Sequence, residues 1–162
     1  METELLRYFD GEKQGAIGFG LAGVIACLVG LVVWRSAAHY RAMLYPLLIV
    51  AAIQFGVFFV IYFRTAAQVD KLLAQLKRAP AEFKLAEGKR MTGVNRSFVV
   101  VEVVELVLFV AAVGICLLKQ ADARWFAVGL GLILQSSAML VFDLAAHRRG
   151  VAYARAISEL QP

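Results

Sequence analysis

The sequence predicts an all-α membrane protein, a single domain (residues 1–162) in which four transmembrane helices form a bundle of two hairpins. Three observations support this: an apolar composition, four apolar blocks of spanning length, and an uneven placement of Lys and Arg. Apolar residues make up 61% of the chain and its mean hydropathy is +0.73, whereas soluble domains are about 45–50% apolar. A soluble core of this chain length cannot bury so much apolar surface, so we expect a bilayer to solvate it.

The four apolar blocks each meet the length requirement of a spanning helix, which is about 20 mostly apolar residues. The predicted spans cover residues 15–34, 43–63, 97–118 and 124–146. The first block is too long for the apolar region of a signal peptide, and both acidic and basic residues precede it. We therefore expect it to be retained as a helix.

The placement of Lys and Arg predicts the orientation in the membrane. Thirteen of them lie in the N-terminal segment, the connector 64–96 and the C-terminal tail, and four lie in or beside the two short hairpin turns. Because segments rich in Lys and Arg stay in the cytoplasm, both termini and the connector are expected on the cytoplasmic side of the inner (plasma) membrane. Basic residues beside apolar blocks suit anionic lipid headgroups, so the net charge of +5 predicts contact with membrane lipids rather than nucleic acid.

The segments outside the spans show amphipathic patterns. Apolar residues at helical spacing in the connector predict that the second helix continues as a stalk; they are Val69, Leu72, Leu73 and Leu76. Pro80 should end this stalk, and a short helix over 81–87 should stop at Gly88. We expect the tail to continue the fourth helix, with Gly150 as a weak point. The N-terminal segment is predicted to lie flat in the membrane interface on an apolar face formed by Leu5, Leu6 and Phe9.

Three acidic residues inside the predicted spans form the main candidate site. Glu102 and Glu105 are three residues apart, which places them on one helix face, and Asp143 lies in the same cytoplasmic half of the membrane. Carboxylates in hydrocarbon are costly and usually mark function. Boundary residues are available to neutralise them: Arg64, Arg96, His147 and Arg148. The acids therefore either pair with these residues as structural groups, bind a proton, cation or substrate, or contact another membrane protein.

Two further sets of residues belong to the predicted bundle interior. Gln54 and Gln135 lie near mid-membrane, where amides commonly form hydrogen bonds between helices; the alternative is a water-lined path to the acids. Small residues at helical spacing in the first span predict a close-packing face, within the bundle or between subunits. This face consists of Gly20, Gly23, Cys27 and Gly30.

Several activities lack their motifs. The chain has no phosphate-binding loop, no zinc-protease or serine-hydrolase motif, and loops too short for a catalytic domain. We expect no enzyme activity, no metal and no cofactor. Two hypotheses remain: a non-catalytic binding or assembly module, such as an immunity or accessory subunit that recognises a membrane partner, and a proton- or cation-coupled small transporter or channel subunit that uses the intramembrane carboxylates. The expected protein partner is a second copy of the chain or another membrane protein.

Overall fold

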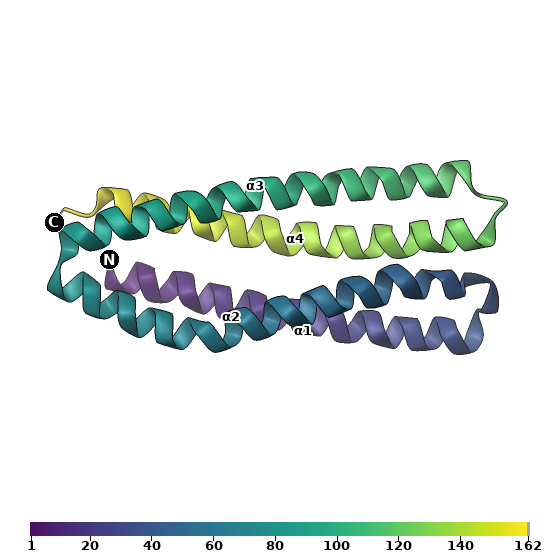
Figure 1. Ribbon diagram of the computed structural model, residues 1–162, viewed down its shortest axis with the longest axis horizontal. Coiled ribbons are helices and arrows are strands. Elements are labelled where there is room, and N and C mark those ends of the chain that lie inside the picture. The colour runs from purple at the N-terminus through teal and green to yellow at the C-terminus, as the bar shows by residue number, and fades with distance from the viewer. Residues whose placement is uncertain (162) are drawn as a thin grey trace.

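The computed structural model describes residues 1–161 and is built of helices and turns. Its elements are α1 (Glu2–Ser36), the short 3-10 helix η1 (Ala38–Met43), α2 (Leu44–Arg78), α3 (Pro80–Leu118) and α4 (Ala123–Glu159) (Figure 1). The four α-helices are each long and apolar enough to cross a membrane, with a mean hydropathy of 1.8 to 2.6 over the most apolar 18 residues. The four-helix prediction and the four apolar spans are confirmed.

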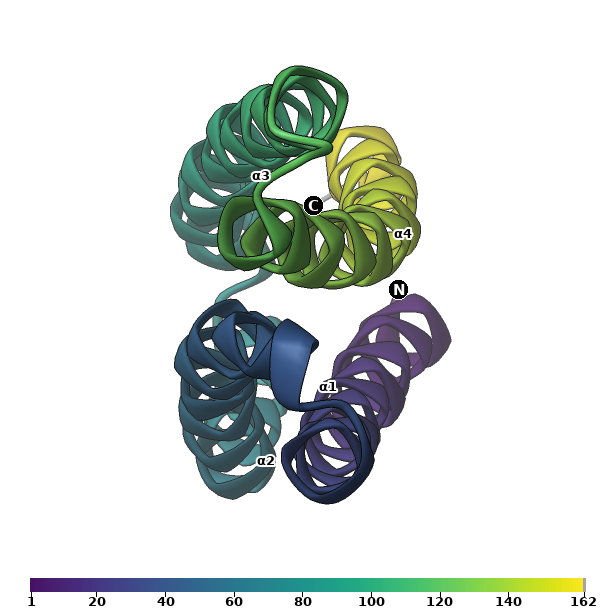
Figure 2. The same ribbon diagram turned by 90° about the vertical axis from the view of Figure 1, so that its right-hand side faces the viewer.

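The helices pair as two hairpins. The strongest packing joins α1 to α2 and α3 to α4, and the two hairpins meet mainly where α4 lies against η1 and α1. Both termini and the turn between α2 and α3 lie at one end of the bundle, whereas the two hairpin turns lie at the other (Figure 1). Viewed along the bundle, the α3–α4 hairpin lies on one side and the α1–α2 hairpin on the other (Figure 2).

The connector differs from the prediction because it contains no short isolated helix. α2 runs to Arg78, only Ala79 is extended, and Pro80 is the first residue of α3. Proline suits this position because the first turn of a helix has no partner for its N–H groups. α3 then continues through Gly88 without a break. Glycine in a helix costs about 1 kcal/mol relative to alanine, and the packing of this segment against Ile157 offsets that cost.

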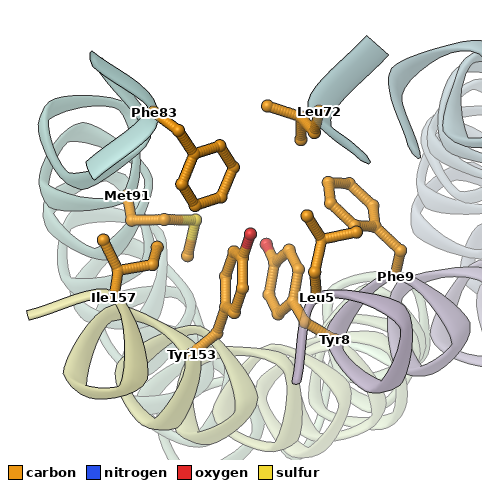
Figure 3. Close-up of a cluster of buried hydrophobic side chains, with 8 residues drawn as sticks. All are labelled: Leu5, Tyr8, Phe9, Leu72, Phe83, Met91, Tyr153 and Ile157. Atoms are coloured by element: carbon orange, nitrogen blue, oxygen red, sulfur yellow. The ribbon is translucent and has the colours of Figure 1, made fainter. Parts of the chain in front are cut away.

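The N-terminal segment also differs from the prediction, because it continues α1 and does not lie flat. Its apolar side chains enter a core near the chain ends, here called the terminal core: Leu5, Tyr8, Phe9, Leu72, Phe83, Met91, Tyr153 and Ile157 (Figure 3). All four helices contribute to this core. Burial among the extended helices removes Leu5 and Phe9 from water more completely than a membrane surface would, while Leu6 stays exposed.

The tail follows its prediction only in part. α4 does continue beyond His147, and it runs through Gly150 without a break and ends at Glu159. A Cβ atom at Gly150 would lie 2.5 Å from Oδ1 of Asn95. The glycine therefore allows α3 and α4 to approach closely, and tertiary packing explains its position better than local flexibility does.

Candidate functional site

The interface between α3 and α4 brings the predicted acidic residues together. The antiparallel packing of these helices places Glu102 opposite His147, and it places Glu105 beside Asp143, one helical turn away. Positions three and four apart share a helix face, so each helix presents its two groups to the other. The three acids, which come from the third and fourth predicted spans, therefore lie together at one interface in the described chain.

Glu102 has a basic partner. Its Oε1 lies 2.8 Å from Nδ1 of His147, and both side chains are mostly buried. The ring of Phe98 stacks on the imidazole at a centroid distance of 5.6 Å, which fixes the ring plane. This pair joins α3 to α4 and corresponds to the structural alternative for an intramembrane carboxylate.

The other three predicted charge partners do not reach the acids. Arg64 lies 4.0 Å from Glu12 of α1, and Arg96 and Arg148 are exposed. Within residues 1–161, neither arginine forms a salt bridge. The exposure of Arg96 and Arg148 shows that they lie on outer sides of their helices.

Glu105 has two buried oxygens without a partner among the described residues, whereas Gln54 has one. The side chain of Glu105 is only 4% exposed, and both carboxyl oxygens are buried without a hydrogen-bond partner among the described residues. Its acidic neighbour Asp143 is also buried, at 8% exposure. Two acids side by side repel each other when both are ionised, and burial without a partner adds to the cost. The arrangement favours the uptake of a proton or a cation.

A groove between α2 and α3 reaches this acid pair. It has a volume of about 660 Å3, and Asp143 lies on its wall among mainly apolar side chains that include Phe19, Ile53, Val57, Phe98 and Val101. Arg90 lies at the part of the groove that is nearest the terminal core. Asp143 thus lines the groove, and Glu105 neighbours Asp143.

The two predicted glutamines form a separate contact between α2 and α4. Nε2 of Gln54 donates to Oε1 of Gln135 at 3.1 Å, and Nε2 of Gln135 donates to the carbonyl oxygen of Leu47 at 3.2 Å. Both side chains are buried. One hydrogen bond between the amides therefore joins α2 to α4, as amides in membrane helices commonly do, while the buried Oε1 of Gln54 has no partner among the described residues.

The predicted small-residue face lies between α1 and α2, inside the bundle. Gly20 and Gly23 contact the rings of Phe58 and Phe55, and Gly30 contacts Leu44. Cys27 is half-buried and packs against a mid-span core that contains Ala26 and Met43. The small residues of α1 thus provide space for the large side chains of α2.

A buried polar network beside the terminal core was not predicted from the sequence. Glu87 is almost fully buried, and two nitrogens of Arg90 donate to its carboxylate, each at 2.7 Å. The hydroxyl of Tyr8 donates to Glu12 at 3.0 Å, whereas the buried hydroxyl of Tyr153 has no partner within the described chain. The four-residue spacing of Tyr153 and Ile157 in the tail was the signal that a packed face extends beyond the membrane.

Burial shifts the protonation of this network, which lies outside the spans. Burial, followed by the charge of Glu12, raises the pKa of Tyr8 above its ordinary value. Burial, followed by the charge of Glu87, does the same to the pKa of Tyr153. Burial acts to lower the pKa of Arg90, but its hydrogen bonds to Glu87 and the nearby charges outweigh that effect and raise it. The hydroxyls therefore stay neutral and the guanidinium stays charged at ordinary pH.

The geometry offers no preformed cage for a transition metal. Across residues 1–161, no group of three or more His, Cys, Asp or Glu side chains is arranged to hold a metal ion. No known protein family, no curated protein and no solved structure matches the chain.

Proposed function

We propose that this multi-pass membrane protein binds a proton or a small cation at the Glu105–Asp143 pair, and that it works as a proton- or cation-coupled small transporter or channel subunit. The observation that supports this proposal most directly is the carboxyl group of Glu105, which is buried with both oxygens unpartnered among the described residues. Its acidic neighbour provides a second set of ligand oxygens.

The contrast with the other buried polar groups strengthens the proposal. Glu102 is paired with His147, and Gln54 donates one hydrogen bond to Gln135 although its Oε1 has no partner, whereas neither carboxyl oxygen of Glu105 has a partner among the described residues. Leaving a buried polar group unpaired costs about 1–3 kcal/mol, and buried groups in native structures are normally satisfied. A membrane protein that retains such a group in one position, while pairing its neighbours, is expected to use it.

The groove beside Asp143 provides the route by which an ion reaches the pair. α2 and α3 pack against each other less than the helices within each hairpin do, and the groove lies between them. Asp143 lines the groove and also neighbours Glu105. A proton or cation that enters from the groove is therefore received by Asp143 and shared with Glu105.

Flux measurements in proteoliposomes test this function. Wild-type protein should dissipate a pH gradient or a monovalent-cation gradient faster than protein-free liposomes. Glu105→Gln should abolish this flux, because the amide has nearly the same shape and carries no exchangeable carboxyl proton. Glu82→Gln is the matched control, since Glu82 is exposed outside the spans. Flux equal to that of empty liposomes, or unchanged flux in Glu105→Gln, contradicts the proposal.

An assembly module is the second candidate, and the open surface of α3 favours it. Only 11% of the most apolar window of α3 is buried, the smallest share among the four helices. Its outward residues are Val99, Val100, Val103, Val104, Leu106, Val107 and Val110. This face suits a helix of a second copy or of an accessory partner. The mass of the complex in mild detergent distinguishes a monomer from an assembly.

The orientation is part of the proposal. The end of the bundle that carries both termini and the α2–α3 turn also carries most of the Lys and Arg residues, so we place this end in the cytoplasm and the protein in the plasma membrane. Reporter fusions after Pro80 and after Gln161 should both report the cytoplasm. A signal from the opposite side at either position would reverse the assignment.

A further inference from the structure

We propose that the end of the bundle formed by the hairpin turns binds the phosphate-bearing headgroup of an anionic phospholipid, with an acyl chain of that lipid lying along α2. A groove of about 730 Å3 lies there, formed by the end of α1, by η1 and by the first turns of α2 and α4. The residues that carry the argument are Trp34, His39, Arg41, Tyr45, Leu48 and Arg124.

The charge of this groove has no counterion in the described structure. Arg41 and Arg124 both line it, and no carboxylate lies within salt-bridge distance of either in residues 1–161. Asp122 is the only acidic residue near this end, and its Oδ1 accepts hydrogen bonds from the backbone of Arg124 and Trp125. It caps α4, and the guanidinium groups remain available for an external anion.

The two arginines line the same groove from different hairpins. The guanidinium carbon of Arg41 lies 5.0 Å from the ring centroid of Trp34, and such a cation–π contact restrains the side chain. Arg124 lies in the first turn of α4, which belongs to the other hairpin and packs against η1. Arginine recognises phosphate oxygens through two parallel N–H groups. A bound headgroup would therefore connect the two hairpins where their turns meet.

The remaining wall of the groove favours a lipid over a free anion. Tyr45, Leu48 and Ile49 line it, all three are exposed, and they follow α2 toward the middle of the predicted span. Aromatic residues such as Trp34 and Tyr45 are typical of the headgroup level of a membrane. The groove combines two arginines with an exposed apolar surface on α2. This combination suits a molecule with an anionic headgroup and an apolar acyl chain.

Lipid binding to the purified full-length protein in detergent tests this site, and the probes are phosphatidylglycerol, phosphatidylcholine and inorganic phosphate. Native mass spectrometry should show tighter binding of phosphatidylglycerol than of phosphatidylcholine. The double variant Arg41→Gln/Arg124→Gln should weaken phosphatidylglycerol binding roughly 30-fold, since it removes two charges at the membrane surface. Arg35→Gln is the matched control, because Arg35 is exposed at the same end and does not line the groove.

Several outcomes would overturn the site. Equal binding of the two lipids, an unchanged affinity of the double variant, or an equal loss in Arg35→Gln would each contradict it. Displacement of the lipid by millimolar inorganic phosphate would assign the groove to a free phosphoryl group. If the double variant does not fold, the salt dependence of lipid binding to the wild-type protein tests the site. Added salt should weaken phosphatidylglycerol binding and leave phosphatidylcholine binding unchanged. None of these results depends on flux through the Glu105–Asp143 pair.

Discussion

Tyr8 and Tyr153 stack face to face in the terminal core, with ring centroids 4.6 Å apart and an interplanar angle of 10° (Figure 3). The contact joins the start of α1 to the end of α4 and brings the two ends of the chain into one core. Stacked aromatic pairs add about 0.5–1.5 kcal/mol beyond their area burial. The helices are therefore held together beyond the predicted spans by packing typical of a soluble protein.

The tyrosine hydroxyls make this core sensitive to alkali. Burial raises the pKa of both hydroxyls above their ordinary value of 10.0, so the folded state holds these protons more tightly than the unfolded state. Below about pH 10, these hydroxyls should make the free energy of unfolding independent of pH. As the pH rises above 10, their ionisation in the unfolded state should lower it. Circular dichroism melts at increasing pH measure this loss.

Two variants test whether Tyr153 causes the loss of stability above pH 10. Tyr153→Phe should be neutral or slightly stabilising at pH 7, because it removes a buried hydroxyl without a partner, and it should reduce the loss of stability above pH 10. Tyr45→Phe serves as the control, since Tyr45 is 70% exposed. An equal effect of the two variants on the alkaline loss would show that the terminal core is not its source.

The hydrogen bond between Gln54 and Gln135 predicts that a double variant regains stability that a single variant loses. Gln135→Leu should lower the free energy of unfolding by about 1–2 kcal/mol, because Gln54 then lacks its partner. Gln54→Leu/Gln135→Leu should regain part of this loss, since replacing both partners with apolar groups is often nearly neutral. Unfolding in mixed detergents provides the measurement. If the double variant loses more free energy of unfolding than the two single variants lose together, the pairing is contradicted.

Close packing between α3 and α4 predicts opposite effects of two glycine substitutions. A Cβ atom at Gly129 would lie 2.5 Å from Sγ of Cys116 and 3.0 Å from the carbonyl oxygen of Ala112, so Gly129→Ala should cost about 1–3 kcal/mol. A Cβ atom at Gly56 meets nothing within 4 Å. Gly56→Ala should therefore stabilise α2 by roughly 0.5–1 kcal/mol. Equal melting temperatures for the two variants would argue against this packing.

The spans could be predicted from the sequence because length and hydropathy alone decide whether a helix suits a bilayer. The continuation of α2 and α4 beyond their spans was predicted correctly, whereas the helix stop at Gly88 was wrong. Judged locally, Gly88 suggested a helix end and Gly150 a weak point, whereas in the fold they lie against Ile157 and Asn95. Leu5 and Phe9 suggested a surface helix, because the sequence does not reveal that the extended parts of α2, α3 and α4 pack against them.

The sequence predicted the approximate membrane depth of the candidate site residues, but not which of them contact one another. Helical spacing grouped Glu102 with Glu105 and placed Asp143 at a similar depth. The register between α3 and α4 decides that Glu102, and not Glu105, contacts His147. Rotation of each helix about its axis decides that Arg96 and Arg148 point outward. Register and rotation depend on side-chain packing between helices, which one sequence without its fold does not specify.

The comparison of Glu105→Gln with Glu102→Gln in thermal unfolding in detergent tests the central claim most directly. Glu102→Gln should lower the free energy of unfolding by about 1–3 kcal/mol, because it leaves His147 without its carboxylate partner. Glu105→Gln should leave stability unchanged or raise it, because no basic partner among the described residues is lost. A loss in Glu105→Gln as large as that in Glu102→Gln would show that Glu105 is a structural group, and it would contradict the proposed ion-binding pair.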